Sequence, residues 1–125
     1  MNVLRKLRTA LAPGALLIDT QPVSALPPVE TNSQYLGALD RREWARTIRS
    51  VDRQVARAID DGLFELTDTT HFDVADEFGG GPQLVKATQR WRGTSVPRAL
   101  AARLARETSP VRLRQAVRLR VLRTP

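Results

Sequence analysis

Cysteine is absent from this chain of 125 residues, which excludes disulfides, thiolate zinc sites and thiol nucleophiles. His71 is the only histidine, so a metal site built from several imidazoles is excluded too. Aromatic residues make up 5% of the chain and offer few rings for stacking on nucleic-acid bases. No apolar run reaches the roughly 20 residues of a membrane span, and Pro13-Gly14 interrupts the one after the basic start. These absences fit a cytoplasmic protein.

Positive charge, by contrast, is in excess. The chain has 20 Lys and Arg against 13 Asp and Glu, a formal net charge of +7, and Lys6 and Lys86 are its only lysines. This excess favours attraction to nucleic acid or another polyanion. Abundant arginine also follows from GC-rich coding, and we favour a solvated arginine surface as its explanation. With 42% hydrophobic and 26% charged residues, the chain has the composition of one globular domain over residues 1–125.

Hydrophobic periodicity and turn residues predict a mixture of helices and strands. The expected elements are a helix over residues 3–11, a strand over 15–20, an extended loop over 21–34, a long helix from Asp40 to Gly62, a strand over 70–78, two helices between Pro82 and Glu107, and a strand over 111–121. The first helix begins almost at Met1, which is typical of an element belonging to something longer. The order predicts an α/β fold whose last strands are antiparallel.

The segment Leu4–Asp19, LRKLRTALAPGALLID, carries a family resemblance. It is similar to the part of class I SAM-dependent methyltransferases in which a helix with "LR…L.PGG.LLI.D" leads into the fifth of seven strands. Ala15 stands where that family has its second glycine. The later elements follow the same order, and Val111–Arg123 corresponds to the seventh strand. The resemblance implies an incomplete Rossmann-like methyltransferase sheet of about three strands with flanking helices.

The resemblance also implies what is missing. The glycine-rich turn and the acid that hold SAM in this family belong to earlier strands, which this chain does not contain. We therefore expect no SAM binding by this chain alone, and a truncated or partner-dependent methyltransferase-like protein that is not catalytic by itself. The first strand would have an unprotected edge. The last strand would be central, and an arginine face there would need solvent or partner carboxylates.

Few residues suggest chemistry of their own. Asp19 ends the expected first strand, where open α/β sheets place ligands, so it is a substrate-side candidate or a cap for the following loop. Gly79–Gly81 stands between a strand and a helix but matches no phosphate-loop pattern, so we interpret it as a flexible turn. His71, Asp73 and Glu77 share one strand face, which we interpret as solvated. No catalytic, cofactor-binding or metal-ligating residue is assigned.

The last strand holds the strongest basic feature. Val111, Leu113, Val117, Leu119 and Val121 alternate with the arginines Arg112, Arg114, Arg118 and Arg120. A row of arginines on a strand can follow a phosphate backbone, so these four are anion or nucleic-acid candidates. An exposed face with arginine stems over apolar surface is the alternative, and we prefer it. Two other functions therefore stay open: a small basic nucleic-acid-binding module, and a noncatalytic structural subunit that dimerises through its strand edge.

Overall fold

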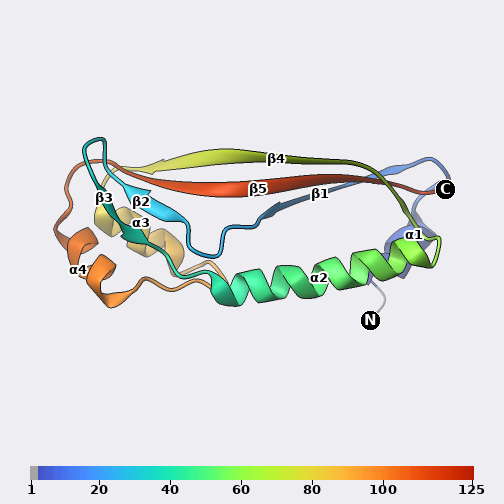
Figure 1. Cartoon of the computed structure of the whole chain (residues 1–125), viewed down its shortest axis with the longest axis horizontal. Coiled ribbons are helices and arrows are strands. Elements are labelled where there is room, and N and C mark those ends of the chain that lie inside the picture. The colour runs from blue at the N-terminus through green and yellow to red at the C-terminus, as the bar shows by residue number, and fades with distance from the viewer. Residues whose placement is uncertain (1–2) are drawn as a thin grey trace.

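The computed structural model describes residues 3–125, and these form an α/β fold with an open five-stranded sheet (Figure 1). The described helices are α1 (Val3–Ala10), α2 (Arg42–Asp60), α3 (Gly81–Thr88) and α4 (Arg98–Arg106), and the strands are β1 (Leu16–Pro22), β2 (Pro28–Glu30), β3 (Tyr35–Ala38), β4 (Glu65–Phe78) and β5 (Val111–Arg123). Every strand pairing in the sheet is antiparallel. The expectation that the last strands are antiparallel is confirmed.

β5 is the central strand of the sheet. β4 pairs with its whole length, from Phe78 opposite Val111 to Glu65 opposite Arg123. The other edge of β5 is shared, because β1 pairs with Val117–Arg123 and β2 pairs with residues 112 and 113. Between them, the loop after β1 takes over the hydrogen bonding of Ala116, whose carbonyl accepts from the Val23 amide at 2.9 Å. β1 and β4 thus run in the same direction on either side of β5.

The buried face of β5 changes along the strand. Val111, Leu113 and Val117 are buried in its first half, whereas Arg120 and Leu122 are buried in its second half. Because side chains alternate between faces, odd and even positions lie on opposite sides of the sheet. Since the pairing with β1 over residues 117–123 is continuous, no bulge in β5 produces this change. Each half of the strand therefore buries a different face.

Two apolar cores correspond to these two faces. The first surrounds Val111 and Leu113 and is completed by β2, β3, α3 and α4, through Val29, Leu36, Leu39, Leu84, Leu100 and Leu104. The second surrounds Leu122 and is completed by α1, α2 and Phe64. Burial of each large aliphatic side chain contributes about 1.5–3 kcal/mol. Figure 1 shows α2 running beneath the part of the sheet that contains β1, with α1 near its end and α3 and α4 at the opposite end of the sheet.

The apolar stripe of α2 determines its orientation. Ile48, Val55 and Ala58 are buried against the sheet. At the start of α2 the capping residue, Arg41, makes no side-chain cap hydrogen bond, and the preceding Asp40 accepts the Arg42 amide through Oδ1 at 3.0 Å. At the other end, Gly62 takes the left-handed backbone conformation, with φ of 75°, that reverses the chain. Within residues 3–125, no helix has the length and apolarity to cross a membrane.

The structure corrects several expected boundaries. The sheet has five strands rather than about three, because β2 and β3 form between Pro28 and Ala38. We expected an extended loop over residues 21–34 and no strand between that loop and the helix from Asp40. These strands have three and four residues, too short for a periodic pattern. β4 begins at Glu65 rather than at residue 70. The first of the two helices expected between Pro82 and Glu107 begins one residue earlier, at Gly81, and ends at Thr88.

Candidate functional site

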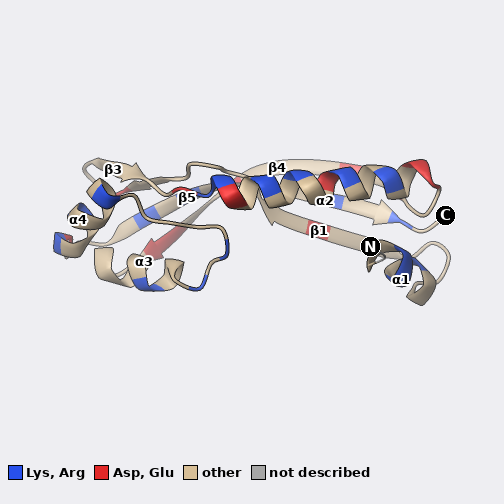
Figure 2. Cartoon of the chain, turned by 90° about the horizontal axis from the view of Figure 1, so that it is seen from below, with Lys and Arg blue, Asp and Glu red and all other residues tan. Residues whose placement is uncertain are grey.

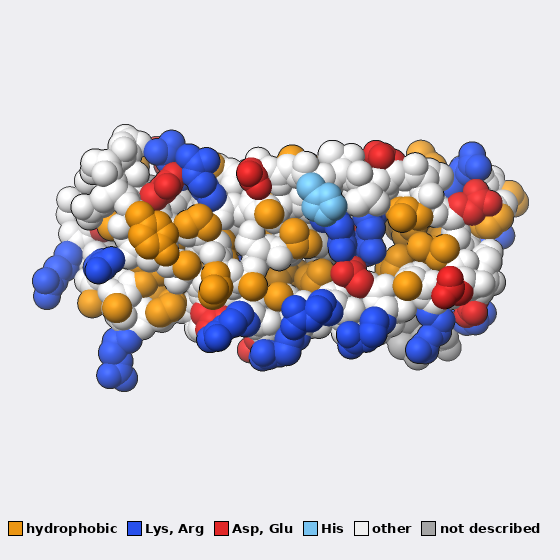
Figure 3. All heavy atoms as spheres, viewed as in Figure 1, with side chains coloured by type: hydrophobic (Ala, Val, Ile, Leu, Met, Phe, Trp, Pro, Cys, Tyr) orange, Lys and Arg blue, Asp and Glu red, His pale blue; other side chains and the backbone are white. Residues whose placement is uncertain are grey.

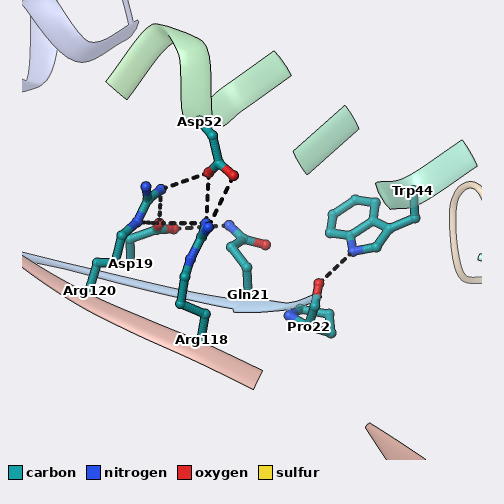
Figure 4. A network of polar contacts seen from close by, with 7 residues as sticks. All are labelled: Asp19, Gln21, Pro22, Trp44, Asp52, Arg118 and Arg120. Carbon is teal, nitrogen blue, oxygen red and sulfur yellow. Dashed lines mark hydrogen bonds and ion pairs between the residues drawn. The ribbon is translucent and has the colours of Figure 1, made fainter. Parts of the chain in front are cut away.

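Four charged side chains meet between the sheet and α2 (Figure 4). Arg118 donates Nη1 and Nη2 to the two carboxylate oxygens of Asp52 on α2, at 3.0 and 2.7 Å. Arg120 donates Nε and Nη2 to Asp19 Oδ2 on β1, at 3.1 and 2.7 Å. The Nη2 atom of Arg120 also lies 3.2 Å from Asp52 Oδ1. Two arginines of β5 thus face two aspartates from two other elements, and we call Asp19, Asp52, Arg118 and Arg120 the ion-pair cluster.

Burial makes the cluster electrostatically strong. The side chains of Arg118 and Arg120 are 13% and 10% exposed. The hydrogen bond from Arg118 lowers the pKa of the Asp52 carboxyl, and the same bond raises the pKa of Arg118. Charges removed from water need close partners, and the bidentate geometry supplies them. Arg118 Nε is the one buried side-chain nitrogen or oxygen among the described residues without a hydrogen-bond partner.

The cluster accounts for two of the four candidate arginines and for Asp19. Arg118 and Arg120 are neutralised by carboxylates, so an incoming phosphate would have to displace Asp52 or Asp19. We expected Asp19 to end β1. It does not, because the strand continues to Pro22. Its Oδ1 accepts Gln21 Nε2 at 3.1 Å, and its Oδ2 accepts Arg120. The arrangement is suited to fixing α2 on the sheet rather than to acid–base chemistry.

Arg112 and Arg114 lie at the other end of β5 and have different surroundings. Arg114 Nε donates to Glu30 Oε1 on β2 at 2.6 Å, and its side chain is 52% exposed. Arg112 Nη2 donates to the side-chain carbonyl of Asn32 at 3.0 Å. The structure therefore separates the four candidates into an inner pair and an outer pair. Only the outer pair is accessible to a large anion.

The candidates of β4 lie on the surface, and the strand pairing places His71 opposite Arg118 of the cluster. His71, Asp73 and Glu77 are exposed on β4 and share one face, as expected. Within the described part of the chain, no three His, Asp or Glu side chains are grouped as a metal site. The Asp61 carboxylate, at the end of α2, pairs with Arg5 Nη2 at 3.2 Å.

Gly79–Gly81 does precede a helix, but its geometry is not that of a cofactor loop. A Cβ at Gly81 would collide with the backbone carbonyl of Leu104, so this glycine allows α3 and α4 to pack closely. The hollow beside it, about 470 Å³ between α3 and α4, is lined by four apolar residues together with Lys86 and Gln89. It has no carboxylate for ribose hydroxyls.

Arg41 is a buried charged residue that no pattern in the sequence indicates. Its side chain is buried, its Nε donates to Thr94 Oγ1 at 3.0 Å and its Nη1 to Gln115 Oε1 at 2.6 Å. The guanidinium also lies 5.5 Å from the ring of Trp44 and 5.7 Å from that of Trp91. Burial lowers the pKa of this arginine. Arg41 holds the loop around Thr94 against β5, and only its place at the start of a capped helix could have drawn attention to it.

Asp52 was overlooked for a different reason. It lies on the flank of an arginine-rich helix, where a single acid resembles solvated surface. Its partner Arg118 is 66 residues away in the sequence.

Comparison with protein families, characterised proteins and solved structures finds no match for this chain. The candidate site therefore depends on its own geometry.

Proposed function

We propose that this chain is a class I methyltransferase-like protein that is not catalytic alone. It would act with a SAM-binding half supplied by another chain or by a preceding segment of a longer protein. The observation that supports this most directly is the position of β5, between β1 and β4 and antiparallel to both. The resemblance implies a last strand that is central in the sheet, and a chance α/β arrangement has many other orders available.

The outer edge of β1 gives the proposal a docking surface. β1 pairs only with β5, so its other edge has no strand beside it in the described chain. Leu16 and Ile18 on this strand are 58% and 61% exposed, although both are large apolar residues. An unpaired apolar strand is a template for strand addition. The resembled family has four further strands that this chain lacks, and in the assembly they would continue the sheet from this edge of β1.

Within such an assembly, this chain would form the distal sheet and one wall of the substrate cleft. Ligands of open α/β sheets lie beyond the carboxyl ends of parallel strands. β1 and β4 run in the same direction, and the segments after their carboxyl ends are β2 with β3 and α3 with α4. Those elements are the proposed wall. The chain's own residues supply shape there, and SAM would supply the methyl group from the other half.

A hybrid chain tests the proposal. The SAM-binding half of a characterised class I methyltransferase, up to its fourth strand, is joined to Val3 of this chain. We expect the hybrid to bind SAM at micromolar concentration by calorimetry, and the β1 amides to exchange hydrogen more slowly than in the chain alone. β1 amides that exchange equally fast in both proteins would contradict the docking of the SAM-binding half on β1. SAM binding by the chain alone would contradict the proposal that the other half binds SAM.

A pair of charge substitutions provides the control. Ile18→Lys places a charge on the outer part of β1, whereas Tyr35→Lys places one on β3 at a side chain with similar exposure, 62% against 61%. Both variants should keep the stability of the isolated chain. Only Ile18→Lys should remove the protection of β1 in the hybrid. Equal effects of the two substitutions would mean that β1 is not the docking strand.

A further inference from the structure

The outer face of α2 carries a row of arginines, visible as blue bands along this helix in Figure 2. Arg46, Arg49, Arg53 and Arg57 are all exposed. At 3.6 residues per turn these four positions lie within a sector of about 80°, and at 1.5 Å per residue they extend over roughly 16 Å. They form one straight basic strip on the side of α2 opposite its buried stripe, and we call it the α2 arginine row.

None of these four arginines has a carboxylate within ion-pair distance among residues 3–125. Arg42, the next arginine toward the start of the helix, differs because it pairs with Asp40 at 2.7 Å. That contact lowers the pKa of Asp40 to about 2 through the Arg42 side-chain and backbone hydrogen bonds. The guanidinium groups of the α2 arginine row therefore lack the direct carboxylate partner that Arg42 has.

The ion-pair cluster helps to keep the row purely basic. Asp52 is the only acid of α2 between Arg46 and Arg57, and it points toward the sheet, where Arg118 neutralises it. The other acids of the helix, Glu43 and Asp60, lie at its two ends. Figure 3 shows the resulting row of basic side chains along one margin of the molecule. Exposed acids gather instead on β4: Asp68, Asp73, Asp76 and Glu77.

The surface near the row also limits how it would bind. Trp44, the aromatic residue of α2, is half-buried and donates its Nε1 to the Pro22 carbonyl at 3.0 Å. It is therefore not presented for stacking on a base. Contacts to phosphates without base stacking are typical of sequence-independent binding to duplex backbones, whereas single-strand binders rely on aromatic platforms.

We propose that the α2 arginine row binds the phosphate backbone of double-stranded nucleic acid without sequence preference. A duplex carries one charge per roughly 1.7 Å of its axis with both strands counted, so the roughly 16 Å row spans a segment that bears about ten phosphate charges. The exposed acids of β4 repel the same polyanion, so it would approach α2 rather than the β4 edge of the sheet. This inference concerns the chain by itself and does not depend on the methyltransferase proposal.

The test is fluorescence anisotropy with a labelled 20-base-pair duplex of random sequence, measured over a range of salt concentrations. The variant Arg46→Gln/Arg49→Gln/Arg53→Gln/Arg57→Gln keeps good helix formers at all four positions. Each lost phosphate contact should reduce the slope of log K against log salt by about 0.9, so the variant should lose roughly three to four units of slope. Its affinity at about 100 mM salt should fall at least tenfold.

A variant of equal charge separates the row from the net charge. Arg90→Gln/Arg92→Gln/Arg98→Gln/Arg106→Gln removes four exposed arginines outside α2. It should bind within about threefold of the unmodified chain if the contacts are local. An equal loss in both variants would overturn the proposal, because net charge alone would then explain the attraction. Absence of duplex binding by the unmodified chain, or binding of inorganic polyphosphate only, would overturn it as well.

Discussion

The two halves of β5 have the same alternating pattern but bury opposite faces. In the first half, Val111 and Leu113 are in a core and Arg114 is exposed. In the second half, Arg120 is buried and Leu119 and Val121 are only partly covered. Apolar residues alternate with arginines in both halves, but Gln115-Ala116 interrupts the alternation and Leu122-Arg123 reverses it. What differs is the element that covers each half, α3 and α4 in one case and α2 in the other.

This difference shows that alternation on a strand defines two faces without defining which one is buried. An arginine face can be covered only where carboxylates meet it, because an unpaired buried charge is strongly destabilising. Asp19 and Asp52 supply those carboxylates in the second half. In the first half Glu30 reaches Arg114 from the rim of the sheet, and the pair stays exposed. The partner acids, rather than the strand itself, determine the buried face.

The largest expected effect comes from truncating the apolar face of the first half. Leu113→Ala removes a fully buried side chain between β2 and α4, and we expect a loss of about 3 kcal/mol in the free energy of unfolding. Leu119→Ala makes the same change on the same strand where the side chain is half-buried, and it should cost below about 1.5 kcal/mol. Urea unfolding measures both values. Equal losses would mean that β5 buries one face along its whole length.

A smaller effect is expected from the charged side of the second half. Asp52→Asn removes the carboxylate that binds Arg118 and leaves two mostly buried arginines with Asp19 alone. Loss of one partner of a fully buried pair costs about 3–5 kcal/mol. Since Asp52 is 32% exposed, we expect roughly 2 kcal/mol in urea unfolding.

Glu30→Gln is the matched change in the first half, because it removes the partner of Arg114, a side chain that is 52% exposed. Exposed ion pairs contribute little, so the loss should be at most about 0.5 kcal/mol. If Glu30→Gln destabilised the protein as much as Asp52→Asn, the division of β5 into an inner and an outer pair of arginines would be wrong.

Acid titration sharpens the same contrast. The pKa of Asp52 is lower in the folded protein than its ordinary value because Arg118 donates to its charged form. The unfolded chain therefore takes up this proton first, so the stabilisation by Asp52 is complete above about pH 4 and is lost as pH falls through the folded pKa. The stability difference between the unmodified chain and Asp52→Asn should stay constant from pH 7 to about 5 and narrow below about 4. A difference that widened in acid would contradict the cluster.

The sequence predicted α2 and β5 correctly for physical reasons, whereas it predicted β4, the longest strand, only from residue 70. α2 has an apolar stripe over more than four turns, and β5 alternates over many residues, so their periods are unambiguous. β2 and β3 were not predicted because strands this short show no repeating pattern. Val29 is fully buried, but its strand partners Gly37 and Leu113 belong to other strands, so no local pattern around Val29 indicates the pairing. Local pattern is informative only where an element is long enough to repeat it.

The candidate site was less predictable than the fold. The need for carboxylates opposite the arginine face followed from the cost of burying charge. Their identity did not, because Asp19 and Asp52 come from a strand and a helix that are close only in the folded chain, at 101 and 66 residues from their partners. Which of the four arginines are buried could not be predicted either, because it depends on the position of α2 over Arg118 and Arg120.

The smallest expected effect concerns the uncovered side of the second half. Ile18→Thr replaces an apolar side chain that is 61% exposed by another β-branched residue, so it should change the stability of the isolated chain by less than about 0.5 kcal/mol. The melting temperature should also be independent of protein concentration. If the chain instead buried this side by self-association, the melting temperature of the unmodified chain would rise with concentration and that of Ile18→Thr would rise less. That outcome would mean that the outer surface of β1 binds a second copy of this chain rather than the proposed SAM-binding half.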